Sequence, residues 1–106
     1  MTLQEMVNQL KEKAAAFDAS GYSGFLAVQV TLSDLEGPFY VEVKDGKLSI
    51  EPYEYHDRQA NMIMTSADFK KMINKKLSPT LAFTTGRLKI EGDIGKATEM
   101  GKLFKK

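Results

Sequence analysis

Residues 77–93 constrain the fold of this chain more than any other segment, because several local signals follow one another there. Ser78 can cap a helix whose first position is a proline, where a missing backbone N–H costs nothing. Gly86 stands where a short helix commonly ends in a left-handed residue. Leu88 and Ile90 then alternate with charged residues, as in a strand with one buried face. The run predicts a helix, a strand and, after its final Gly-Asp pair, another helix.

The first half of the chain alternates in hydrophobicity with a period of two. This pattern predicts a half-buried strand over 25–32 and a second strand over 39–44. Asp45-Gly46 is typical of a two-residue hairpin turn and leads into a third strand. Pairing of Val43 with Leu48 places the apolar residues of this hairpin on one face, which must meet helices.

Amphipathic helices and a crossover complete the pattern. Thr2 and Glu5 have capping-box spacing, and the helix that they begin is predicted to end before Gly21. Segment 51–59 is predicted to be a solvated connecting loop, and its length suggests a crossover to a fourth strand over 61–64.

A helix follows the fourth strand, with Thr65 or Ser66 as its cap and Phe69 facing inward. The predicted order is helix, three strands, crossover, strand, helices, strand, helix. This order indicates an α+β fold with a five-stranded, mostly antiparallel sheet covered on one face by helices. We expect residues 1–106 to form a single domain, because the length suits one core and no linker or repeat interrupts it.

The composition excludes some classes of function. The 15 basic and 14 acidic residues nearly cancel, so no strong overall field attracts nucleic acid. The chain has no cysteine, which excludes a disulfide framework and a thiol nucleophile and fits a reducing compartment. No apolar run approaches the ~20 residues that span a bilayer. The expected location is the cytoplasm.

Catalytic groups are sparse. His56 is the only imidazole, and its polar surroundings beside Asp57 favour a solvated loop histidine over a catalytic one. One histidine cannot supply the paired ligands that zinc enzymes use. Glu51 and Glu54 are expected in the same wet loop, without an apolar wall to raise a pKa. We therefore expect no catalytic residue, no metal site and no cofactor; an enzyme that uses loop 53–57 is the third-ranked interpretation.

Segments 60–69 and 77–93 together resemble the second half of the sterol carrier protein 2 family of lipid-binding domains. The first half of the chain is similar to the family in pattern only. Two positions depart from the family pattern: Asn61 replaces an acidic residue, and Lys75-Lys76 replaces a small residue followed by lysine. The residues that carry the resemblance are Ala60, Thr65, Ser66, Asp68, Phe69, Leu77, Pro79, Ala82, Phe83, Gly86, Leu88, Lys89, Ile90, Gly92 and Asp93.

The C-terminal half contains more apolar side chains than an ordinary core requires. Methionine adapts to irregular shapes, so the pattern alone allows either a packed core or an adaptable pocket. The resemblance implies a hydrophobic tunnel between sheet and helices that holds a sterol, a fatty acyl chain, an acyl-CoA or a phospholipid tail. The expected tunnel lining is Met62, Met64, Phe69, Met72, Ile73, Leu81, Phe83, Leu88, Ile90, Ile94, Met100, Leu103 and Phe104.

The expected function is non-catalytic: the chain binds and transfers fatty acid, fatty acyl-CoA, phospholipid or sterol. The alternative is a regulatory or protein-interaction module that uses the same apolar groove for a partner. If the chain is a lipid carrier, the last helix is expected to be the wall of the tunnel that moves to admit the ligand. Gly101 weakens this helix by ~1 kcal/mol relative to alanine. Alternatively, Gly101 only permits close packing.

A local basic surface is predicted on the helix that follows the fourth strand. One interpretation is that this surface contacts an anionic membrane or the phosphates of CoA. The other is that it is a solvated helix face. Its residues are Lys70, Lys71, Lys75 and Lys76, to which Lys102, Lys105 and Lys106 can add.

Overall fold

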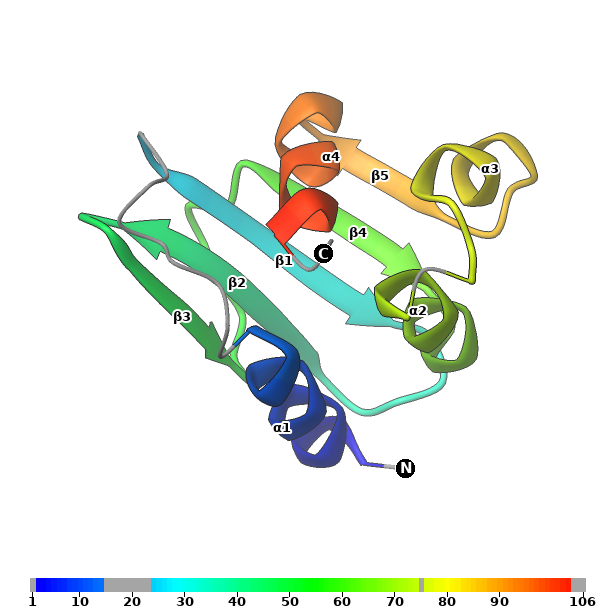
Figure 1. The fold of residues 1–106 in the computed structure, drawn as a ribbon, viewed down its shortest axis with the longest axis horizontal. Helices are drawn as coiled ribbons and strands as arrows, with labels where there is room; N and C mark the ends of the chain where they lie inside the picture. Colours follow the sequence, from blue (N-terminus) through cyan, green and yellow to red (C-terminus); the bar gives the residue numbers. More distant parts are fainter. Residues whose placement is uncertain (1, 15–23, 75, 104–106) are drawn as a thin grey trace.

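The computed structural model describes residues 2–14, 24–74 and 76–103. The element order agrees with the predicted one (Figure 1), while the predicted end of the first helix before Gly21 lies outside the described residues. The elements are α1 (Leu3–Ala14), β1 (Leu26–Leu32), β2 (Pro38–Lys44), β3 (Lys47–Glu51), β4 (Ala60–Met64), α2 (Ser66–Ile73), α3 (Pro79–Thr84), β5 (Lys89–Gly92) and α4 (Ile94–Leu103).

The sheet has five strands in the order β3-β2-β1-β4-β5. β1 and β4 are parallel, and the other three neighbouring pairs are antiparallel. The helices gather on one face of this sheet (Figure 1). The predicted α+β class, the mostly antiparallel sheet and the crossover before β4 are therefore confirmed.

The hairpin between β2 and β3 follows the predicted register. Asp45 and Gly46 have φ values of 53° and 75°, the left-handed pair that a type I′ turn requires. Val43 lies opposite Leu48 in the antiparallel ladder. Because side chains alternate along a strand, this register turns the apolar residues of both strands toward the helices.

The core lies between the sheet and the helices. Met6, Val7 and Leu10 of α1 are fully buried, and α1 contacts β2 and β3. Phe39 of β2 meets Phe69 of α2 edge to face, with ring centroids 5.5 Å apart. The predicted capping box also forms, because the backbone N–H of Glu5 donates to the Thr2 hydroxyl.

The opposite face of β1 is the main departure from the sequence prediction. β1 was expected to be half buried, yet Ala27 is fully buried and Gln29 is only 5% exposed. The reason is the crossover segment 52–59, because the Tyr55 N–H donates to Gln29 Oε1 at 3.1 Å. The Tyr55 hydroxyl also donates to Glu42 Oε2 at 2.7 Å. Tyr55 thus holds the segment against the back of the sheet, while His56 and Glu54 are exposed, as expected for a solvated connecting loop.

A strip of hydrogen-bonded side chains runs across this back face. Asn61 Oδ1 accepts from the Thr31 hydroxyl at 3.0 Å and from Gln29 Nε2 at 3.4 Å. Asn61 Nδ2 donates to Glu91 Oε1 at 3.1 Å. An amide can accept and donate at once, whereas a carboxylate at this position would face Glu91 with like charge. The local contacts therefore explain why asparagine suits a position where the resembled family has an acidic residue.

Hydrogen bonds join the turn after β1 to the start of α2. The Thr65 hydroxyl accepts from the Asp68 N–H at 3.2 Å, so Thr65 is the cap. Ser66, the other predicted candidate, instead donates from its backbone N–H and its hydroxyl to Asp34, at 2.8 and 2.5 Å. These hydrogen bonds lower the pKa of Asp34, since they favour its charged form.

Candidate functional site

An apolar pocket of about 160 Å³ lies between α3, α4 and the β4–β5 edge of the sheet. Six of its eight lining side chains are apolar and the other two are threonines. The lining residues are Met62, Thr80, Phe83, Leu88, Ile90, Ile94, Ala97 and Thr98.

The floor of the pocket is largely buried and its rim is exposed. Met62 and Ile90 are neighbours across the β4–β5 ladder, and Met62, Leu88 and Ala97 are buried. At the rim, Phe83 is 43% exposed and Ile94 is 52% exposed. A surface of this kind holds an apolar molecule by burial, without directional polar contacts along it.

The helix caps position α3 above the floor. Ser78 Oγ accepts from the Leu81 N–H at 3.4 Å, and Gly86 ends the helix region with a φ of 81°, as the sequence predicted. The N–H groups of Arg87 and Leu88 then donate to the carbonyl of Ala82, at 2.9 and 3.0 Å. The chain therefore reverses sharply from α3 into β5, and both contribute to the pocket.

A close backbone approach positions α4. Gly92 has a φ of 92°, and a Cβ atom there would lie 2.6 Å from the Gln59 carbonyl oxygen. Asp93 Oδ1 accepts from the Lys96 N–H at 3.2 Å and caps the helix, as predicted. Ala97 is buried, so α4 meets the sheet through a small side chain. The helix therefore begins directly beside the strand edge that forms the floor.

The structure brings five of the thirteen predicted lining residues together in this pocket: Met62, Phe83, Leu88, Ile90 and Ile94. Leu81 is 53% exposed and is not among the pocket residues. The side chain of Leu103 and all of Phe104 lie outside the described part of the chain. The remaining predicted residues are buried in the core beside the pocket: Met64, Phe69, Met72, Ile73 and Met100.

Sequence reasoning did not include Thr80, Ala97 and Thr98 in the predicted lining. Ala97 and Thr98 follow Ile94 by three and four residues, the spacing of one helix face, so this signal was present in the sequence. The Thr98 hydroxyl donates to the Ile94 carbonyl at 3.0 Å. Its hydrogen-bonding need is therefore met inside the helix, and its methyl group is available to the pocket.

A second hollow, of about 490 Å³, lies beside the β2–β3 turn. It is lined by Gly24, Phe25, Lys44 and Asp45-Gly46. A charged pair and one aromatic ring do not form the continuous apolar wall that an acyl chain requires. The α3–α4 pocket is therefore the better candidate for an apolar ligand.

The residues considered for catalysis lie apart from this pocket. His56 is exposed, and its Nδ1 lies 3.7 Å from Glu54 Oε1. Glu51 is paired with Lys11 at 3.2 Å instead of facing the other loop carboxylates. Burial and the hydrogen bond to Glu42 raise the pKa of Tyr55 to about 12, with the hydrogen bond the larger cause. Within residues 2–14, 24–74 and 76–103, no three His, Asp or Glu side chains gather as a metal site.

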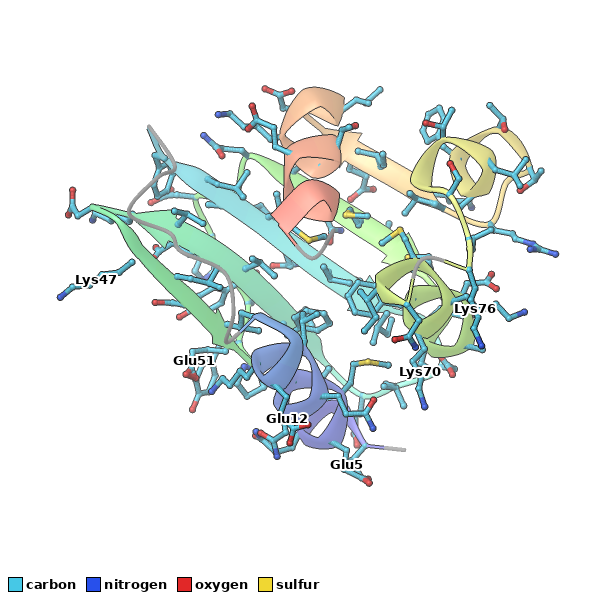
Figure 2. The ribbon with its side chains drawn as sticks, in the orientation of Figure 1. Glu5, Glu12, Lys47, Glu51, Lys70 and Lys76 are labelled. Carbon is cyan, nitrogen blue, oxygen red and sulfur yellow. The ribbon has the colours of Figure 1, made fainter. Side chains whose placement is uncertain are left out.

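The predicted basic surface lies mainly on α2. Lys71 and Lys76 are exposed, while Lys70 is half-buried. Figure 2 shows Lys70 and Lys76 on the same side of the molecule, away from Lys47 at the β2–β3 turn. The side chains of Lys75, Lys102, Lys105 and Lys106 lie outside the described residues.

An apolar pocket of this kind is typical of sites that bind apolar molecules. The sequence matches the SCP-2 sterol transfer family over residues 3–105, so the chain belongs to that family. Membership indicates sterol or lipid binding and transfer as the general role. None of the described helices is sufficiently long and hydrophobic to traverse a bilayer.

The relatives that the chain matches are longer than the chain itself. Hydroxysteroid dehydrogenase-like protein 2 of Xenopus tropicalis is 40% identical over 80 residues, which cover 72% of this chain and 19% of the relative. Human sterol carrier protein 2 is 29% identical over 105 residues, which cover 97% of this chain and 19% of the relative. The chain therefore spans about a fifth of the length of these relatives.

The fold is shared with a solved structure of palmitated SCP2L2 from Aedes aegypti. The TM-score is 0.66 at 16% identity, and the match covers 100% of this chain and 96% of that one. At this identity the likeness concerns the fold.

Proposed function

We propose that this chain binds hydrophobic ligands in the α3–α4 pocket and transfers them, without carrying out a reaction. Fatty acid, fatty acyl-CoA, phospholipid and sterol are the proposed ligand classes. The observation that carries the proposal is the pocket itself, an uncharged apolar surface with a buried floor and an exposed rim. Membership of the family and the absence of cysteine support a lipid carrier in a reducing compartment such as the cytoplasm.

The size of the pocket indicates how a long ligand must be accommodated. At about 160 Å³ it is smaller than the ~300 to 1,000 Å³ typical of sites for drug-sized ligands. It is close to the ~150 Å³ of an engineered cavity that holds benzene. In this state the pocket can therefore hold a short part of an acyl chain, and a whole chain needs the walls to separate.

The free energy of an empty cavity favours a narrow pocket over a wide one when no ligand fills it. At ~24 cal/mol per Å³, an enclosed void of 160 Å³ costs about 4 kcal/mol, and one of ~300 Å³ about 7 kcal/mol. The larger value is comparable to the whole stability of a domain. Each ligand methylene that replaces water contributes ~0.8 kcal/mol, so a long chain can offset the cost of opening.

The proposed movable wall is α4. It contacts the sheet through the small Ala97, its sequence contains Gly95 and Gly101, and its first residue, Ile94, is largely exposed. Glycine within a helix costs ~1 kcal/mol relative to alanine, which lowers the cost of local opening. The lack of polar groups at the floor supports broad selectivity among apolar chains.

The test is a matched pair of substitutions at two exposed threonines. Thr98 lines the pocket, whereas Thr84 on α3 does not, and both hydroxyls donate to carbonyls of the preceding helical turn. Thr98→Trp fills the pocket from its rim and is expected to weaken binding of a fluorescent fatty acid to delipidated protein by at least ~10-fold. Thr84→Trp is the control and is expected to bind as the unmodified protein does.

Equal binding by the two variants would contradict the assignment of this pocket. If the unmodified protein takes up no fatty acid, acyl-CoA, phospholipid or sterol, the alternative function gains support. In that case the apolar groove serves a protein partner, and the chain is a regulatory or interaction module.

A further inference from the structure

We propose that α3 docks the protein on an anionic lipid surface, with Leu81 and Phe83 inserted among the acyl chains. Lys76 and Arg87, which flank the helix in the sequence, contact the phosphates of the headgroups. This inference deepens the proposed function, because the pocket opens beside the same helix and Phe83 belongs to both.

The first support is the exposure of apolar side chains on α3. Leu81 is 53% exposed and Phe83 is 43% exposed, and Ile94 at the start of α4 adds a third exposed apolar side chain. Among the α3 side chains whose burial is described, only the small Ala82 is buried. A helix that buries its alanine and presents leucine and phenylalanine to solvent is arranged for contact with another apolar phase.

The second support is the distribution of charge. Residues 69–90 contain six of the 15 basic residues of the chain and none of its 14 acidic residues. Lys71, Lys76 and Arg87 are exposed. The segment that carries the apolar helix is therefore strongly cationic within a chain that is nearly neutral, which matches an anionic surface.

The third support is the placement of these groups in the molecule. Figure 1 shows α3 at a corner of the fold, beside the start of β5 and next to α2. Lys70 and Lys76 lie on this side in Figure 2, whereas Glu5, Glu12 and Glu51 lie on the side of α1 and β3. Lys70 and Lys76 would draw this side of the molecule toward an anionic surface.

A lipid surface fits this patch better than a protein partner does. Two or three apolar side chains provide far less than the ~1,000 Å² of buried area that a stable protein interface needs. They are sufficient for shallow insertion, because each buried leucine contributes its transfer free energy and each nearby cation adds its attraction to the lipid. Docking through α3 would also place the rim of the pocket at the membrane, where a lipid can pass between them.

The experiment measures sedimentation of the full chain with vesicles of phosphatidylcholine alone and of phosphatidylcholine mixed with phosphatidylglycerol. We expect binding to the mixed vesicles that falls as salt rises. Leu81→Ser is expected to lower the partition coefficient ~10-fold, since the lost leucine side chain no longer transfers into the acyl layer. Lys76→Gln and Arg87→Gln are each expected to lower it ~5-fold.

Matched controls lie far from α3 in the sequence. Tyr53 is 65% exposed on the crossover segment, so Tyr53→Ser removes an apolar group of similar exposure. Lys47→Gln removes an exposed cation at the β2–β3 turn. Both controls are expected to partition as the unmodified protein does.

The proposal would be overturned if the partition coefficient fell equally for Leu81→Ser and Tyr53→Ser, or equally for Lys76→Gln and Lys47→Gln. Equal binding to neutral and anionic vesicles would overturn it as well. Failure to bind either kind of vesicle would also overturn the proposal. A protein would then be the candidate partner for the α3 surface. Fatty-acid binding in solution is measured separately: its absence would refute the proposed function, while the vesicle results still decide the role of α3.

Discussion

Two helices cover the same sheet in different ways. α1 places the large side chains of Met6, Val7 and Leu10 against β2 and β3, and all three are fully buried. α4 covers β1, β4 and β5 with one large buried side chain, Met100, beside the small Ala97, and it leaves Ile94 half in solvent. The described apolar side chains of α1 are therefore packed closely on the sheet, while a pocket of about 160 Å³ lies beside α4. If the proposed function is right, stability and ligand binding are carried by different parts of the same face of the sheet.

The largest expected effect is on stability, and it distinguishes the α1 side of the fold from the α4 side. Leu10→Ala removes a fully buried side chain and is expected to lower the free energy of unfolding by about 3 kcal/mol. Ile94→Ala truncates a side chain that is half exposed and is expected to cost less than ~1 kcal/mol. Urea unfolding of both variants measures the difference. A larger loss for Ile94→Ala would mean that α4 carries the stability instead.

A second effect concerns local opening. In delipidated protein, the amides of α4 are expected to exchange with solvent ~10-fold faster than those of α1, because α4 has fewer large buried side chains and contains glycines. A bound fatty acid should slow exchange in α4 and leave α1 unchanged. Hydrogen exchange followed by mass spectrometry resolves the two helices. Equal protection in delipidated protein would contradict the comparison.

The smallest expected effect involves pH and the back of the sheet. The pKa of Tyr55 is raised to about 12, so its folded value lies above the ~10 of an unfolded chain. Its contribution to stability is therefore fully present below pH ~10 and is lost as the pH rises through about 12. Tyr55→Phe should cost about 1 kcal/mol at neutral pH and remove this alkaline step.

All four tyrosines absorb when they ionise, so the difference in tyrosinate absorbance between the unmodified protein and Tyr55→Phe during an alkaline titration reports the Tyr55 pKa. The pocket has no titratable side chain in its lining, so fatty-acid binding should not follow the same transition. A Tyr55 that ionises at the ordinary value would show that the crossover segment is not held against β2.

Much of the fold could be predicted because its signals are local. The Asp45-Gly46 turn, the Ser78 and Asp93 caps and the alternation in β2 depend on residues close together in the sequence, and the structure contains them. The burial of Gln29 could not be predicted in this way. It depends on Tyr55, which reaches β1 only after the chain has crossed behind the sheet.

The pocket was predicted less completely for a related reason. Met62 and Met64 have the same side-chain direction in β4 and similar hydrophobicity, yet only Met62 lines the pocket. Periodicity identifies the buried face of a strand, but the gap above that face depends on which helix side chains lie opposite. Here the small Ala97 lines the pocket, whereas Met100, three residues further along α4, is fully buried in the core.

The central claim is that an apolar guest completes the interior beside α4, and native mass spectrometry of the purified protein tests it most directly. We expect part of the protein to carry a bound lipid, to lose it on delipidation and to recover one equivalent of added fatty acid. Thr98→Trp should carry none, while Thr84→Trp should behave as the unmodified chain. A protein that remains ligand-free at every fatty-acid concentration would contradict the claim.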